Sequence, residues 1–236
     1  MVGLGESLHA SGGYHRVIAR VVRFLVEKKG FRLLAFESPW KGAEAVARYV
    51  QTGEGRAKHA LQGLIPQFRS REIADLVEWL RERNRKHPQD PVRVAGFDVQ
   101  QFGFRLQPDG HDATALSGFL AKLSPAEVSS VQPGLVQCGA PRKDGWPGPL
   151  SPEEYARCLR ALDAVETLLD RESFVSRSSR RERELAAISA TVLRHWAGFA
   201  FHRDNEFERN SHRDAGMARV LARHGSLEAI GARAVL

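Results

Sequence analysis

Three short apolar runs, each followed by an acidic residue, constrain the fold of this chain most. They are Val2–Gly5 before Glu6, Leu33–Phe36 before Glu37, and Val92–Phe97 before Asp98. Each has the length and composition of a buried β-strand. Helical patterns separate the runs, and parallel strands need crossovers of this kind. The sequence therefore predicts an α/β fold with a central parallel sheet and covering helices.

The stretches between these runs carry apolar residues at helical spacing. In Tyr14–Lys29 they recur three and four residues apart, and Gly30 follows as a C-terminal stop. Shorter helical patterns lie at Gly42–Gln51 and Ile73–Asn84, between the second and third runs. We expect these helices to cover the sheet.

From about Asp112 the sequence changes to longer helical patterns, which predict a large helical insertion. They are Leu116–Leu123, a capped start at Ser124–Glu127, Ser151–Leu169 and Glu182–Phe201, with a loop predicted over Cys138–Pro149. We expect an α/β half over residues 1–111, a helical region over residues 112–232 and the start of a further strand over residues 233–236, in one structural domain. The abrupt first and last strands suggest a fragment that lacks both ends.

Composition narrows the possible partners. The chain has 35 Lys+Arg and 28 Asp+Glu, but arginine is spread through every segment, so we predict no nucleic-acid partner. Since no apolar run approaches the ~20 residues of a membrane helix, we predict no membrane partner either. Cys138 and Cys158 lack metal-binding spacing and allow at most one disulfide, which favours a cytoplasmic protein.

Several polar side chains are predicted to meet at one edge of the sheet. Ligands of open parallel sheets bind at the carboxyl ends of the strands, where Glu6, Glu37 and Asp98 fall, and His9 follows Glu6 on the turn into the first helix. An imidazole held by a carboxylate can take a proton from water as the water attacks a carbonyl. Acids at strand ends also serve as helix caps, so the pattern alone leaves both interpretations open.

Four motifs follow one another along nearly the whole chain. They are Gly5-Glu6-Ser7-Leu8-His9, the strand end Phe36-Glu37 after an Arg-rich helix, Glu78-Trp79-Leu80-Arg81 followed by Gly96-Phe97-Asp98, and Arg213-Asp214-Ala215-Gly216-Met217-Ala218. In this order they resemble the erythromycin esterase family of hydrolases. Four ordered matches are more specific than any one of them.

The resemblance implies hydrolysis of a small-molecule ester or lactone, in the best-known members macrolide ring opening, with no cofactor and no obligatory metal. It assigns His9 as the general base, with Glu6 and Glu37 orienting His9 and the water. Arg213 would bind substrate or neutralise the oxyanion, and Asp98 would shape the site.

The chain also departs from the family pattern. The family continues with a Trp-Ala-His-Asn-x-His segment where this chain ends, at Leu236, so we expect impaired catalysis. Two alternatives stay open: a divalent-metal site among Glu6, His9, Glu37 and Asp98, and a catalytically incomplete binding module or pseudo-enzyme. Of the other histidines, His202 and His212 are expected to face solvent at helix ends, and His15 to pack.

Overall fold

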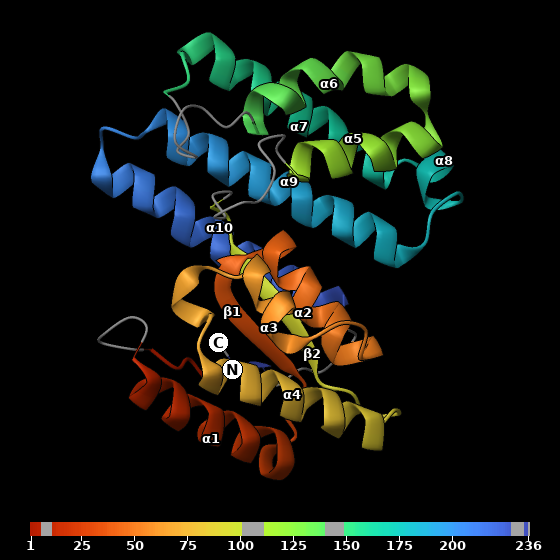
Figure 1. The fold of residues 1–236 in the computed structure, drawn as a ribbon. Helices are drawn as coiled ribbons and strands as arrows, with labels where there is room; N and C mark the ends of the chain where they lie inside the picture. Colours follow the sequence, from red (N-terminus) through yellow and green to blue (C-terminus); the bar gives the residue numbers. More distant parts are fainter. Residues whose placement is uncertain (6–10, 101–110, 140–148, 228–233, 236) are drawn as a thin grey trace. The chain divides into compact units, whose positions relative to one another are not determined.

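The computed structural model describes residues 1–5, 11–100, 111–139, 149–227 and 234–235. The chain divides into two compact units. The sheet unit holds the described residues of 1–98 and 224–235, and the helical unit holds those of 99–223. Figure 1 shows the helices and strands of each unit. The expectation that the chain forms one structural domain stays a prediction.

The sheet unit contains the predicted parallel sheet, which is small. Strand β1, Leu33–Pro39, pairs in parallel with β2, Arg93–Asp98. The short strand β3, Ala234–Val235, pairs in parallel with the start of β1, so the strand order is β2-β1-β3. β1 is therefore the central strand, and its side chains are buried at every position except Glu37.

The strand predicted over Val2–Gly5 is wrong. Among its residues only Val2 makes an isolated bridge, while Val2 and Leu4 are partly buried against the core of the sheet unit. Gly3 and Gly5 have no side chain to pack on a pleated surface and lose more conformational freedom on ordering than other residues do. The alternation of glycine with apolar residues therefore gives a packed segment without a strand.

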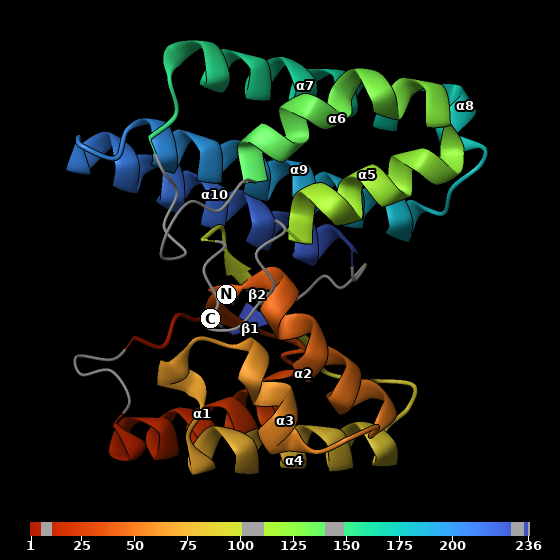
Figure 2. The same ribbon diagram turned by 45° about the horizontal axis from the view of Figure 1, so that its top comes forward.

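The helices of the sheet unit begin and end close to the local sequence signals. They are α1 Gly12–Lys29, α2 Trp40–Thr52, α3 Ala57–Ala60, η1 Leu61–Gly63, η2 Pro66–Phe68 and α4 Arg71–Lys86. α1 ends where Gly30 takes a left-handed conformation with φ of 71°. α4 begins where the side chain of Ser70 accepts a hydrogen bond from the backbone N–H of Ile73. Figures 1 and 2 show α1 and α4 lying side by side.

The helical unit is built from α5 to α9 and most of α10. The bounds are α5 His111–Leu123, α6 Pro125–Gly139, α7 Pro152–Asp170, α8 Glu172–Val175, α9 Arg180–Phe201 and α10 Glu206–Leu227. Capping boxes fix the starts of α7, at Ser151 and Glu154, and of α9, at Ser179 and Glu182. α5, α6, α7 and α9 pack around one apolar core (Figure 2).

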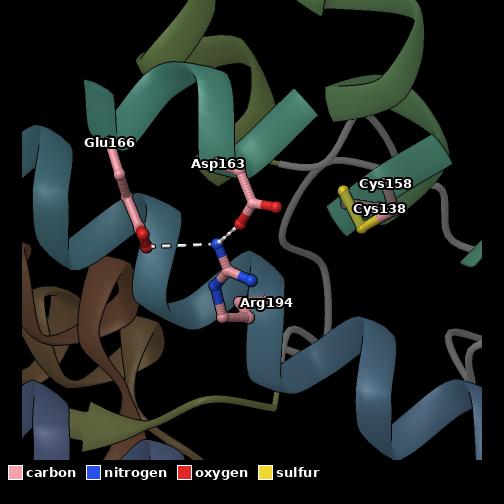
Figure 3. The surroundings of a disulfide bond; sticks show 5 residues. All are labelled: Cys138, Cys158, Asp163, Glu166 and Arg194. Atoms are coloured by element: carbon pink, nitrogen blue, oxygen red, sulfur yellow. Dashed lines mark hydrogen bonds and ion pairs between the residues drawn. A yellow bond between two sulfur atoms is a disulfide. The ribbon is translucent and has the colours of Figure 1, made fainter. Parts of the chain in front are cut away.

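Two features tie α7 to its neighbours. Cys138 of α6 and Cys158 of α7 form a disulfide with 5.2 Å between their Cα atoms (Figure 3). The guanidinium of Arg194 on α9 contacts Asp163 at 2.6 Å and Glu166 at 3.3 Å. Because α6 continues through Gly139, the predicted loop cannot begin at Cys138, and residues 140–148 lie outside the described part of the chain.

Two features of the structure concern the location of the protein. No helix in the described part of the chain is both long and apolar enough to cross a membrane. Structural disulfides are rare in reducing compartments, so the Cys138–Cys158 bridge does not favour the predicted cytoplasmic location. That location stays a prediction.

Candidate active site

The carboxyl end of β1 exposes one acidic side chain. Parallel pairing with β2 is regular from Leu33 to Phe36 and then shifts, so that Pro39 is the next residue of β1 in register. Glu37 lies inside this irregularity and is exposed, whereas Ser38 is fully buried. The Ser38 hydroxyl oxygen accepts a hydrogen bond of 3.1 Å from the backbone N–H of Ile65. The irregularity thus turns Glu37 outward and ties the next residue to the segment before α4.

Asp98 lies next to this segment. It is the last residue of β2, is paired in register with Pro39, and is only 3% exposed. β2 approaches closely here because residue 96 is glycine. A Cβ atom at Gly96 would lie 2.6 Å from the backbone oxygen of Ser38 and 2.8 Å from the Cα atom of Trp40. The Gly-x-Asp pattern of this strand therefore has a packing reason.

Two buried aromatic rings lie at this end of β1 that the sequence did not predict as part of the site. Trp40, the first residue of α2, is 3% exposed, and His224 of α10 is 7% exposed. Their ring centroids are 6.2 Å apart, and the ammonium of Lys41 lies 4.0 Å from the centroid of the Trp40 ring. His224 is more than a hundred residues from Asp98 in sequence and belongs to no spaced motif, so no local signal could have linked it to the sheet.

The remaining site residues that the sequence predicts are Glu6, His9 and Arg213. Glu6 and His9 lie outside the described residues, so the geometry of the proposed base stays a prediction. Within the described ranges, no group of three histidine, cysteine, aspartate or glutamate side chains could hold a metal ion. Because Glu6 and His9 are two of the four proposed ligands, the metal alternative is not tested by this. Arg213 is partly buried on α10 in the helical unit.

The expectation that His202 and His212 face solvent is wrong. Both are partly buried, and their rings stack with 5.0 Å between centroids. The ring of His195 on α9 lies 6.1 Å from that of His212. A Cβ atom on Gly198 would lie only 2.2 Å from Nδ1 of His212, so this glycine lets α9 and α10 approach closely. The histidines pack an interface between two helices.

His195 is the most perturbed of these histidines. It is 5% exposed, and burial lowers its pKa to about 4, with a further contribution from the positive charge of Arg219. Nη1 of Arg219 lies 3.2 Å from Nε2 of His195. Since a guanidinium only donates hydrogen bonds, Nε2 is the acceptor and His195 is neutral near pH 7. Burial also lowers the pKa of His212.

Fold and site together define a mostly helical protein with a small parallel sheet that carries acidic residues at its carboxyl edge. A family model described as erythromycin esterase matches residues 26–236. The chain therefore belongs to the erythromycin esterase family. The resemblance drawn from the four sequence motifs is confirmed.

Solved structures share the fold. A Bacillus cereus protein aligns with 99% of this chain and 55% of its own at 22% identity and a TM-score of 0.78. A succinoglycan biosynthesis protein aligns with 99% of this chain and 55% of its own at 19% identity and a TM-score of 0.76. A mutant of the erythromycin esterase EreC in its open conformation aligns with 100% of this chain and 59% of its own at 16% identity and a TM-score of 0.64.

A curated relative is more similar in sequence over a shorter stretch. YbfO of Bacillus subtilis (strain 168), which is described as a hydrolase, is 28% identical over 101 residues. That alignment covers 42% of this chain and 22% of YbfO. The chain thus spans less than two thirds of the length of each of these relatives.

Proposed function

We propose that this chain acts as a hydrolase of ester or lactone bonds in small molecules. The observation that carries the proposal is the exposed Glu37 at the end of an otherwise buried strand, beside Asp98, in a member of the erythromycin esterase family. An exposed carboxylate at the carboxyl edge of a parallel sheet occupies the usual ligand-binding position of such sheets. Hydrolase relatives support the reaction class.

In the proposed reaction, His9 accepts a proton from water while the water oxygen attacks the carbonyl carbon of the substrate. Glu6 and Glu37 orient His9 and the water, and Arg213 neutralises the charge that develops on the carbonyl oxygen. The tetrahedral intermediate then collapses, and the bond to the leaving alcohol oxygen breaks. The alcohol takes the proton back from His9, and a carboxylic acid is left.

Asp98 has a different proposed role. At 3% exposure it is too buried to meet substrate as Glu37 could, and it lies in register with Pro39 at the end of β1. We therefore propose that it shapes the site by holding the two strand ends together. Macrolides are a narrower proposal for the substrate, which rests on the erythromycin esterase relative alone.

The experiment is a panel of p-nitrophenyl esters, simple lactones and a macrolide, each incubated with the wild-type chain and with His9→Ala. We expect hydrolysis of at least one substrate class by the wild type, at a low rate. Because a general base contributes about 10²–10⁴-fold, hydrolysis should fall by that factor in His9→Ala. A wild-type chain that hydrolyses nothing would favour the binding-module alternative. Undiminished activity in His9→Ala would remove His9 from the mechanism.

A further inference from the structure

His15 makes a buried polar contact that packing alone does not require. It lies in the first turn of α1 and is fully buried. Its Nδ1 lies 2.8 Å from the hydroxyl oxygen of Ser70. Ser70 is the N-cap of α4, where the same oxygen accepts a hydrogen bond from the N–H of Ile73. The imidazole is thus bonded to the residue that starts the neighbouring helix.

Two further contacts hold the same turn of α1 against the first turn of α4. A Cβ atom on Gly12 would lie 2.9 Å from a carboxylate oxygen of Glu72, so the helices meet closely at this glycine. Nε of Arg16 lies 3.7 Å from that oxygen. The Arg16 side chain is 73% exposed, and such an exposed ion pair contributes little. The His15–Ser70 bond is therefore a buried polar link between the two helix starts.

The segment that ends at Ser70 also contacts Phe36 and Ser38, the two residues that flank Glu37. The ring of Phe68, two residues before Ser70, lies 6.3 Å from the ring of His15 and 5.2 Å from the ring of Phe36. On the other side of Glu37, Ser38 accepts the hydrogen bond from the N–H of Ile65. Residues 65–70 therefore connect the end of β1 with the starts of α4 and α1.

We propose that His15 is a positioning residue for the hydrolase site. Bonded to Ser70, it fixes the start of α1 relative to the end of β1, where Glu37 lies. This inference rests on the proposed function, in which Glu37 at this strand end helps to orient the attacking water. An apolar ring would fill the same volume without bonding to Ser70. Misplacement of a catalytic group by about 1 Å can lower the rate about 10²-fold, so a small shift of Glu37 would lower kcat.

The experiment compares kcat and KM for His15→Leu, His15→Asn and Ser70→Ala. Leucine keeps an apolar side chain but cannot bond to Ser70, whereas the asparagine amide can donate or accept near the Nδ1 position. His59→Leu is the control, because His59 is exposed on α3. We expect His15→Leu and Ser70→Ala to lower kcat by about 10–100-fold with KM within about twofold of wild type. His15→Asn should recover most of kcat, and the control should match wild type.

Each other outcome has a definite meaning. A folded His15→Leu variant with wild-type kcat would show that His15 only packs and would overturn the inference. If His15→Leu does not fold, Ser70→Ala decides, and wild-type kcat in that variant would overturn it equally. A wild-type chain without hydrolytic activity would instead overturn the proposed function on which the inference rests.

Discussion

Pro39 of β1 and Asp98 of β2 lie in register, so the two strands end together. This pairing comes after an irregularity in β1 that contains the exposed Glu37. A bulge in a strand re-aims side chains and is common next to active sites. The irregularity explains how one carboxylate is exposed on a strand whose other side chains are all buried.

The close approach of β2 to the end of β1 predicts a large penalty for a side chain at Gly96. In Gly96→Ala the new Cβ would meet backbone atoms of Ser38 and Trp40 at 2.6–2.8 Å, and backbone cannot rotate away. We expect a loss of about 1–3 kcal/mol in the free energy of unfolding, measured by urea denaturation.

Gly118→Ala is the matched control for this measurement. Gly118 lies within α5, and beyond its chain neighbours and its own helix backbone, no atom of the described residues lies within 4 Å of the position its Cβ would take. Because alanine favours a helix over glycine, this variant should be unchanged or more stable by up to about 1 kcal/mol. Equal stability of Gly96→Ala and wild type would contradict the packing described for the strand ends.

The Cys138–Cys158 disulfide predicts that the helical unit is sensitive to reduction. The bridge closes a loop with a sequence separation of 20 and lies in the apolar core. In the chain-entropy model a loop of about this length contributes about 3 kcal/mol. We expect dithiothreitol to lower the Tm of the wild type but not that of a Cys138→Ser/Cys158→Ser variant. An equal decrease in both proteins would show that the bridge does not carry the effect.

The neutral His195 predicts a loss of stability in acid. Its pKa is about 4 in the folded chain and ~6.5 in the unfolded chain, so folding favours the neutral imidazole. The contribution of His195 is complete above pH ~6.5 and decreases as the pH falls towards 4. The full difference is about 3 kcal/mol, since one pKa unit corresponds to ~1.4 kcal/mol.

The measurement is the free energy of unfolding of the helical unit at pH 7 and pH 4.5. His195→Gln should weaken this pH dependence, because glutamine cannot titrate. His59→Gln, at an exposed position outside the interface of α9 and α10, should keep it. The same pH dependence in His195→Gln and wild type would place its cause elsewhere.

Helix boundaries were predictable from the sequence because their signals are local. Gly30 ends α1 and Ser151 begins α7 through contacts within a few residues. The β1 and β2 strands were also predictable, since continuous burial leaves an apolar run in the sequence. At Val2–Gly5 the same rule failed, because two of the four residues are glycines that have no side chain to pack.

Most long-range contacts could not be predicted from local sequence patterns. His224 meets Trp40 only through the path of α10, and the stacking of His202 on His212 depends on how α9 and α10 pair. His15 was expected to pack, but its bond to Ser70 joins residues 55 positions apart. Glu37 and Asp98 could be placed at one sheet edge because parallel strands share their direction.

Ester hydrolysis by Glu37→Gln is the direct test of whether Glu37 belongs to a hydrolytic site. Glu54→Gln is the matched control, because Glu54 is exposed in the same unit after the end of α2. We predict that kcat/KM falls by about 10²-fold or more in Glu37→Gln at unchanged stability, and that Glu54→Gln retains wild-type activity. Equal kcat/KM for Glu37→Gln and wild type would show that Glu37 has no part in hydrolysis.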